Sequence, residues 1–150
     1  MRIITTLFFV LLLISCVGVK YQHPYVDAPH ATFQNPEEEV ISQFHWRKYF
    51  VQQIDSVDVN YSDEAWSGIY GSTKRVAPGS HILTIRATFN YDNSGVFFCL
   101  IDIEASLEEG KNYILEGETT LDGVRVWLKD KESGKIASNI GFYEAPIPNK

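Results

Sequence analysis

Two stretches near the middle of the chain alternate apolar and polar residues with a period of two. The odd positions from Leu83 to Tyr91 are apolar and the even positions between them are polar, and the odd positions from Phe97 to Ala105 are again apolar. This period is typical of β-strands that bury one face. Residues 92–95, Asp-Asn-Ser-Gly, have the composition of a turn. The pattern therefore predicts an antiparallel hairpin over residues 82–105.

Shorter runs of the same kind lie on either side of this hairpin. Residues 49–59 are rich in β-branched and aromatic side chains, residues 124–129 alternate, and residues 113–115 and 135–143 follow turn sequences. Six or seven strands at a spacing of 8–14 residues predict an all-β fold, a single antiparallel β-sandwich of the immunoglobulin or transthyretin kind. A short helix is also expected after Asn35, because acidic residues precede the apolar positions that begin at Val40.

The N-terminal residues 1–15 have the pattern of a secretory signal peptide. Arg2 precedes an apolar core from Leu7 to Ile14, and the small residue Ser15 follows. An uncleaved membrane anchor is the alternative, but a transmembrane helix needs about 20 apolar residues. Residues 13–16, Leu-Ile-Ser-Cys, resemble a bacterial lipobox, which implies cleavage before Cys16 and its modification with diacylglyceryl and palmitate groups. The competing interpretation is a signal peptide that contains a cysteine by chance.

These features predict the organisation and location of the protein. Residues 16–36 hold three of the six prolines and no sustained period, so they are interpreted as a lipidated cysteine followed by a semi-rigid tether. The β-sandwich is expected over residues 37–144, with a flexible C-terminal tail at 145–150. The protein is expected in the bacterial cell envelope, held to the membrane by lipid on Cys16. In the lipoproteins that residues 13–16 resemble, an aspartate after the cysteine signals retention in the inner membrane, so Val17 implies the outer membrane, with the domain facing the periplasm or the surface.

Charge and cysteine content exclude several classes of function. The chain has 13 Lys and Arg against 19 Asp and Glu, a net charge of −6, which disfavours nucleic-acid binding. Two cysteines make neither a disulfide framework nor a four-thiolate zinc site. Cys99 lies on the apolar face of its strand and is interpreted as a buried thiol rather than a nucleophile. The sequence contains no catalytic or nucleotide-binding fingerprint, so we expect no catalytic residues, no cofactor and no enzymatic activity.

Histidines and acidic residues offer weaker candidates. His23, Asp27 and His30 are metal-ligand types, but they fall in the predicted tether, so we expect a solvated linker and no metal. His81, at the start of a strand, is interpreted as a structural or exposed histidine. The acidic residues 55, 58, 63 and 64 do not have the spacing of a calcium loop and are interpreted as a solvated edge.

An aromatic loop is the candidate binding surface. Tyr61, Trp66 and Tyr70 occur in a glycine-bearing connection, where aromatic rings are able to stack on a sugar ring or a partner protein. The alternative is that these rings cover an open end of the sandwich.

Three turn-and-strand motifs resemble those of small bacterial envelope lipoproteins. They are Pro-Gly-Ser-His at 78–81, Gly-Lys-Asn-Tyr at 110–113, and a strand that runs from Trp127 into the turn before Gly134 and Lys135. The resemblance covers residues 54–135 and implies a β-sandwich without an assigned activity. We therefore expect a non-catalytic lipoprotein that binds an envelope protein or a glycan. The alternatives are an inhibitor or immunity-type lipoprotein directed at a cell-wall hydrolase and, less favoured, a small envelope hydrolase.

Overall fold

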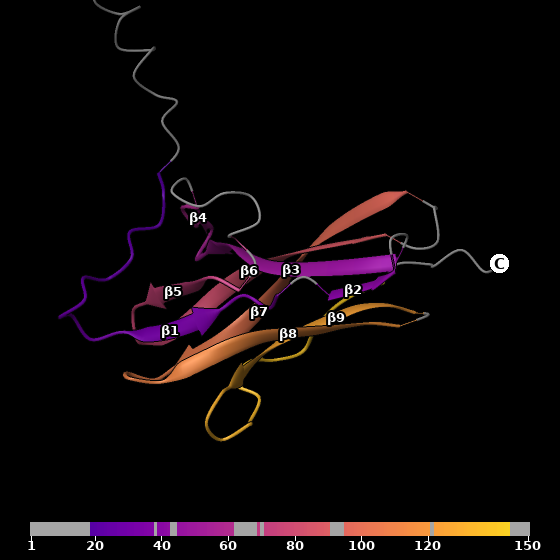
Figure 1. Cartoon of the computed structure of the whole chain (residues 1–150). Coiled ribbons are helices and arrows are strands. Elements are labelled where there is room, and N and C mark those ends of the chain that lie inside the picture. The colour runs from indigo at the N-terminus through magenta and orange to yellow at the C-terminus, as the bar shows by residue number, and fades with distance from the viewer. Residues whose placement is uncertain are drawn as a thin grey trace, which may run out of the picture.

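The computed structural model of the chain describes residues 19–37, 39–42, 45–61, 69, 71–90, 95–120 and 122–144. These residues form ten β-strands in two sheets that pack against each other, and they include no helix (Figure 1). The strands are β1 (Ala31–Gln34), β2 (Glu39–Ser42), β3 (His45–Ile54), β4 (Val57–Asp58), β5 (Thr73–Val76), β6 (Gly79–Asn90), β7 (Val96–Leu107), β8 (Asn112–Thr120), β9 (Gly123–Asp130) and β10 (Gly141–Glu144). The predicted all-β sandwich is confirmed.

The order of the strands defines two sheets. Sheet A has the order β2-β3-β6-β7, with β4 also paired to β3, and sheet B has the order β10-β9-β8-β1-β5. The described strands outnumber the six or seven predicted, because β1, β2, β4, β5 and β10 have only two to four residues. Strands this short show too little alternation to be recognised in a sequence.

The central hairpin follows the predicted alternation closely. β6 and β7 pair antiparallel from Gly79 with Leu107 to Asn90 with Val96. The odd-numbered side chains face sheet B, and Leu83, for example, is fully buried. The predicted hairpin is therefore confirmed. β8 and β9 also pair antiparallel, and alternate β9 side chains are buried as expected.

The folded domain begins earlier than predicted. β1 lies inside sheet B, parallel to β8 on one side and antiparallel to β5 on the other. Ala31 and Phe33 are fully buried, and Tyr21 packs against the core. Residues 21–36 are therefore not a free tether. The sequence did not reveal this because β1 is short and obtains both of its partners from distant parts of the chain.

The helix expected after Asn35 is wrong. Residues 39–42 form β2, which pairs antiparallel with the start of β3. The carboxylate of Glu39 binds the guanidinium of Arg47 across this pair. Acidic residues before an apolar run favour a helix only when no neighbouring strand competes for the same backbone hydrogen bonds.

Residues 135–140 join the two sheets at one edge instead of forming one long closing strand. The amide of Ala137 donates to the carbonyl of Leu128 in sheet B, and its carbonyl accepts a hydrogen bond from Ser106 in sheet A. Asn139 continues the contact by bonding the backbone of Glu104 with both its amide and its side chain. This edge of the sandwich is therefore closed by main-chain hydrogen bonds.

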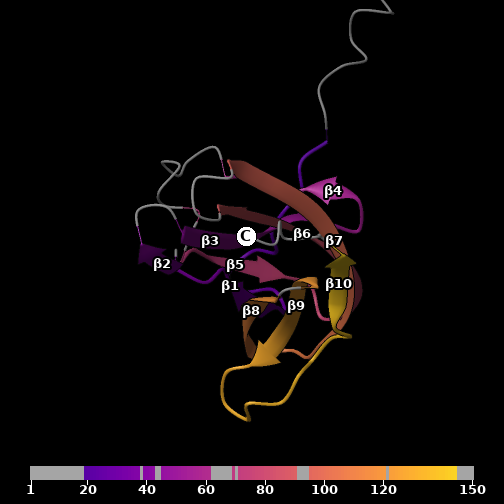
Figure 2. The same cartoon turned by 90° about the vertical axis from the view of Figure 1, so that its right-hand side faces the viewer.

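β10 then runs beside β7 (Figure 2). The close approach requires glycine at position 141, because a Cβ there would lie 2.5 Å from Cγ2 of Ile101. The contact places the C-terminal strand against the core of sheet A as well as in sheet B.

A buried asparagine links the two sheets inside the sandwich. Asn35 is fully buried, and its side-chain carbonyl accepts a hydrogen bond from the amide of Val51 in β3. Its side-chain amide lies 3.1 Å from Oη of Tyr61, 3.0 Å from the carbonyl of Ile69 and 3.3 Å from Oγ of Ser72. One polar side chain thus holds β1, β3 and the chain before β5 in register.

Several predictions concern residues outside the described ranges. These are the signal peptide at 1–15, the lipidation site Cys16, the tail at 145–150, and two aromatic residues, Trp66 and Tyr70. Within the described ranges, the structure contains no apolar helix long enough to cross a membrane.

Candidate functional site

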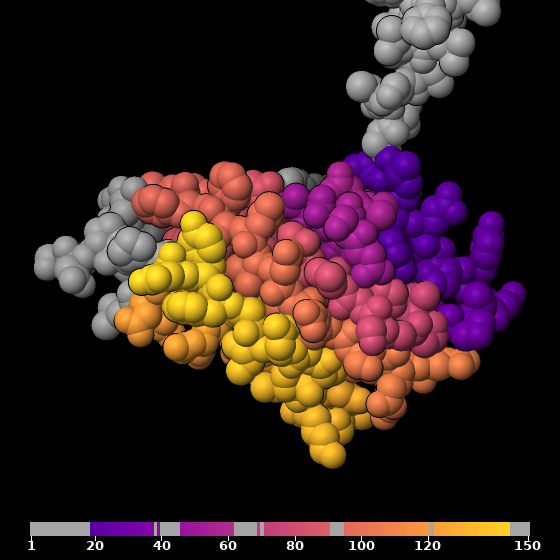
Figure 3. All heavy atoms as spheres, turned by 180° about the vertical axis from the view of Figure 1, so that it is seen from behind, coloured from indigo at the N-terminus to yellow at the C-terminus, as the bar shows by residue number. Residues whose placement is uncertain are grey.

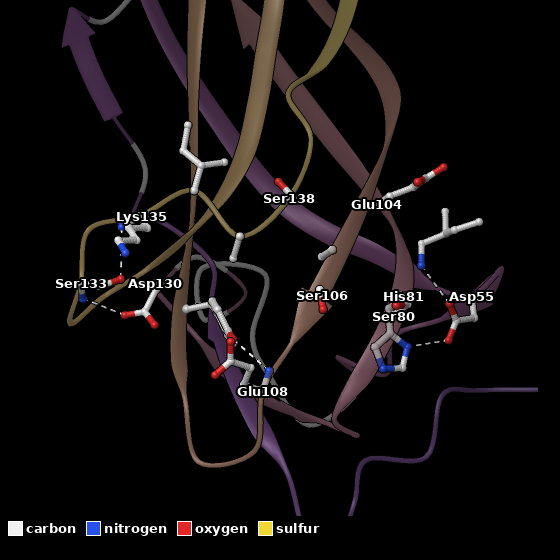
Figure 4. A pocket seen from close by; sticks show the side chains of 15 residues that line it. Asp55, Ser80, His81, Glu104, Ser106, Glu108, Asp130, Ser133, Lys135 and Ser138 are labelled. Carbon is white, nitrogen blue, oxygen red and sulfur yellow. Dashed lines mark hydrogen bonds and ion pairs between the residues drawn. The ribbon is translucent and has the colours of Figure 1, made fainter.

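An open groove of about 850 Å³ lies at the closed edge of the sandwich, and we call it the edge groove (Figure 4). The start of β6, the end of β7 and the segment that joins the two sheets form its walls. Four carboxylates face one lysine and one histidine among the residues around it. The lining residues are Asp55, Ser80, His81, Ile82, Glu104, Ala105, Ser106, Glu108, Tyr113, Asp130, Ser133, Lys135, Ile136, Ala137 and Ser138.

Asp55 and His81 form an ion pair at one end of the edge groove. Asp55 Oδ2 lies 2.7 Å from Nδ1 of His81, and Asp55 Oδ1 accepts a hydrogen bond from the amide of Ile82 at 2.9 Å. The second ring nitrogen of His81 lies 2.8 Å from the carbonyl of Ala77. Both ring nitrogens are therefore engaged by oxygen atoms of the protein, and neither is presented to a substrate as a free base.

The pair stabilises an unusual turn between β3 and β4. Asp55 and Ser56 form this two-residue turn with φ angles of 50° and 66°, values that glycine or asparagine adopts more easily. Desolvation raises the pKa of Asp55, but the hydrogen bond from Ile82 and the interaction with His81 outweigh it and hold that pKa below its usual value. The carboxylate thus keeps its charge and fastens the strained turn to β6.

Asp130 plays a similar structural role at the other end of the edge groove. Its Oδ1 accepts hydrogen bonds from the amides of Glu132 and Ser133, both at 2.8 Å. The hydrogen bond from Ser133 is the largest influence on the pKa of Asp130, and together with the other amide and Lys111 it lowers that pKa against the effect of desolvation. The polar groups of the edge groove are thus held in fixed positions by the turns that carry them.

The described residues of the edge groove form no nucleophile–base pair and no metal-binding group. Within the described ranges, no hydrogen bond joins His81 to a serine hydroxyl, and nucleophilic catalysis by serine needs such a pair. No three His, Cys, Asp or Glu side chains of these residues lie close enough to hold a metal ion. What the edge groove offers a ligand is a set of oriented carboxylates and hydroxyls beside a short apolar segment.

The structure places Tyr61 in the packing of the domain. Its hydroxyl donates to the carbonyl of Val51 at 2.7 Å and accepts from Asn35, and its ring packs edge-on against Phe50 at 5.8 Å. The ammonium of Lys74 lies 4.8 Å from the centre of the same ring. Tyr61 is therefore held in place by contacts within the domain. A binding role for Trp66 and Tyr70 stays a prediction.

The histidines of the predicted tether are also used structurally. Nδ1 of His23 lies 2.6 Å from the carbonyl of Arg75, and Nδ1 of His30 lies 2.7 Å from the carbonyl of Ala28. Asp27 forms no part of a metal-binding group in the described ranges.

The single cysteine of the described ranges behaves as predicted. Cys99 is buried in the core, and desolvation raises the pKa of its thiol to about 11. Such a thiol is almost entirely protonated at neutral pH and is a poor nucleophile.

The sequence alone did not reveal the edge groove. Its residues come from five separate segments, and only His81 and Asp55 had attracted attention individually. The one local signal in the sequence was Asp55-Ser56 at a turn that usually contains glycine, and the structure shows positive φ angles at both residues.

The protein was compared with known proteins at three levels. Neither the models of protein families, nor the curated proteins, nor the solved structures contain a match to this chain. The resemblance to small envelope lipoproteins therefore rests on the sequence motifs alone and stays a prediction.

Proposed function

We propose that the protein is a lipid-anchored lipoprotein of the bacterial cell envelope that acts by binding and not by catalysis. The N-terminal signal pattern and the lipobox-like residues that end at Cys16 support the anchor. The edge groove supports the binding role, because four carboxylates line it, hydrogen bonds hold two of them, Asp55 and Asp130, in place, and its histidine is engaged on both nitrogens. A polar ligand with positive charge, such as a basic segment of an envelope protein, fits this lining best.

The anchor is tested by following lipid on the chain. Cells that express the wild-type protein are labelled with radioactive palmitate and fractionated, and Cys16→Ser is compared with Cys99→Ala. We expect label and membrane association for the wild type and Cys99→Ala, and neither for Cys16→Ser. Membrane association of Cys16→Ser equal to that of the wild type would show that the anchor is wrong.

The binding role is tested by photocrosslinking from inside the edge groove. A photoreactive phenylalanine analogue replaces Ser106, which lines the groove, or Asp122, which is exposed on the distant β8–β9 turn. Both chains are expressed in intact cells, and crosslinked products are recovered through an affinity tag. We expect a discrete product of defined mass from position 106 only. The same products from both positions, or none from either, would contradict binding in the edge groove.

A further inference from the structure

The outer face of sheet A carries an exposed apolar and cationic surface that the edge groove does not include. We call it the outer-face patch. Its members follow from the strand register, because residues with even numbers on β6 and β7 point away from sheet B. They are Trp46 and Lys48 on β3, Arg86, Thr88 and Asn90 on β6, and Val96, Phe98 and Leu100 on β7.

The apolar side chains of the outer-face patch are unusually exposed. Val96 and Phe98 are each 62% exposed and Leu100 is 48% exposed, although they are neighbours on one face of one strand. A row of large apolar side chains open to water is costly, and it marks a surface that is covered in the working state of a protein. From Cys99 onward the same strand buries its other face, whereas Phe97 at its start is 43% exposed.

Cations lie directly on the aromatic rings of this surface. The guanidinium of Arg86 lies 4.7 Å from the centre of the Phe98 ring, and the ammonium of Lys48 lies 4.9 Å from that of Trp46. Arg86 forms no ion pair with any residue that the structure describes, and its Nε lacks a hydrogen-bond partner. Aromatic rings with basic groups beside them are typical of surfaces that sit at the headgroup level of a membrane.

Acidic residues occupy the other end of the same face. Asp102 and Glu104 follow Leu100 on the outer side of β7, and Asp58 lies across the sheet at the level of Asp102. The outer face is therefore divided along its strands into an aromatic, cationic half and an acidic half. An anionic surface would attract the first half, and in the second half the charge of Asp58 is paired with Lys20.

The N-terminal end of the described chain lies on the same side of the molecule. Lys20 forms a β-bridge and an ion pair with Asp58 on β4, the strand at the edge of sheet A. Figure 1 and Figure 3 show the first described residues, in indigo, on the side of sheet A, with the start of β7 on the same side at the opposite end of the sandwich. Three residues lie between Cys16 and Lys20, and the four steps from one to the other span at most about 14 Å even when fully extended.

This short connection limits how far the domain is able to move from a lipid on Cys16. Asp58 and Asp102 lie in one row of paired residues across sheet A, three strand spacings of about 4.8 Å apart. Phe98 lies four residues from Asp102 along β7, a distance of about 13 Å. Lys20 lies one strand spacing beyond Asp58, so it is about 23 Å from Phe98 across the sheet, which is more than the reach of the connection. A flat surface that holds the anchor is able to touch both.

We propose that the outer-face patch docks onto the bilayer that holds the lipid anchor, with Phe98 and Leu100 at the headgroup boundary and Arg86 bound to lipid phosphate. The proposal rests on the proposed anchor at Cys16. Docking in this orientation directs sheet B and the yellow β9–β10 segment of Figure 1 away from the membrane.

The test measures how close two labelled positions of the full lipidated chain lie to the lipid bilayer. Thr88→Cys places a label beside Phe98, its cross-strand partner, and Glu118→Cys places the same label on the half-exposed outer face of sheet B. Cys99 is buried and does not compete for the label. Each protein carries an environment-sensitive fluorophore and is reconstituted into phosphatidylethanolamine–phosphatidylglycerol vesicles that contain spin-labelled lipid. We expect a blue shift and several-fold stronger quenching at position 88 than at position 118.

Two variants separate docking from anchoring. Phe98→Ser with Leu100→Ser is expected to reduce quenching at position 88 to the level at position 118 while the chain still sediments with the vesicles. Arg86→Gln is expected to abolish the difference in quenching between anionic vesicles and phosphatidylcholine vesicles. Both changes are on exposed or partly exposed positions, and circular dichroism verifies the fold.

The outcomes distinguish the two proposals. Equal quenching at positions 88 and 118 in chains that sediment with vesicles would overturn docking and leave the anchor intact, and the outer-face patch would then belong to a protein partner. If the wild-type chain purified from cells carries no lipid and does not sediment with vesicles, the anchor is wrong. Docking from that anchor is then wrong as well.

Discussion

Removal of the Asn35 side chain is the most direct test of how the sandwich is held together. Asn35 is fully buried and forms hydrogen bonds with groups from three segments. Of these groups, the amide of Val51 loses most when the side chain is removed, because it donates its hydrogen bond to Asn35. Asn35→Ala leaves that amide without a hydrogen bond. The other groups lose less, because the carbonyl of Ile69 still accepts from Ser72 and the hydroxyl of Tyr61 still donates to the carbonyl of Val51.

The expected destabilisation follows from these contacts. One buried amide without a partner costs about 1–3 kcal/mol. The space left by the truncated side chain adds about 1 kcal/mol, because the surrounding strands relax only in part. We therefore expect Asn35→Ala to lower the free energy of unfolding by about 2–4 kcal/mol, a large part of the stability of a domain of this size.

Urea unfolding followed by tryptophan fluorescence measures the effect. The matched control is Asn139→Ala, because the side-chain carbonyl of Asn139 also accepts a hydrogen bond from a backbone amide, that of Glu104, at 2.8 Å. Asn139 is exposed, so water replaces the lost bond, and the control is expected to change stability by less than about 0.5 kcal/mol.

A second substitution separates hydrogen bonding from cavity formation. Asn35→Asp preserves the shape but replaces a donor by a carboxylate that faces the carbonyl of Ile69. Burial raises the pKa of such a carboxyl group, so its unfavourable effect is absent below the unfolded pKa of about 3.9 and grows as the pH rises. We expect greater destabilisation at neutral than at acidic pH. Equal effects of Asn35→Ala and Asn139→Ala, or no pH dependence in Asn35→Asp, would refute the role of Asn35.

Four further predictions concern other sites. Ser56→Gly is expected to stabilise the domain by about 0.5–1 kcal/mol in urea unfolding, because the φ of 66° strains a residue with a Cβ, and unchanged or lower stability would show that the turn is not strained. Gly141→Ala is expected to destabilise it by about 1–3 kcal/mol in the same assay, because the new Cβ would overlap Ile101, and a neutral result would contradict the close contact of β10 with β7. Cys99 is expected to resist iodoacetamide at neutral pH until urea unfolds the protein, because burial raises the pKa of its thiol to about 11, and rapid alkylation of the folded chain would disprove this. Asp55→Asn is expected to lower the stability of the domain at neutral pH but not in acid. The pKa of Asp55 is lowered in the folded state, so the contribution of its charge to stability disappears as the pH falls through that pKa. A constant difference in stability between Asp55→Asn and the wild type across an acid titration would exclude the interaction.

The sequence by itself determined the parts of the fold that depend on local alternation. The β6–β7 hairpin was predictable because each strand is long enough to repeat its pattern several times, and a shift of register by one residue would expose the whole apolar face. The turn glycines at 79 and 110 were predictable for a related reason, since both adopt positive φ angles that disfavour residues with a Cβ.

Only the tertiary structure decided the role of residues 31–42 and of the groups around the edge groove. β1 and β2 are four residues each and acquire their identity from strands elsewhere in the chain, so no local pattern distinguishes them from a tether or a helix. Three features depend on which segments of the chain meet: the hydrogen bonds of Asn35, the Asp55–His81 pair and the exposed row on β7. The packing of the two sheets decides which segments meet, and no single stretch of sequence does.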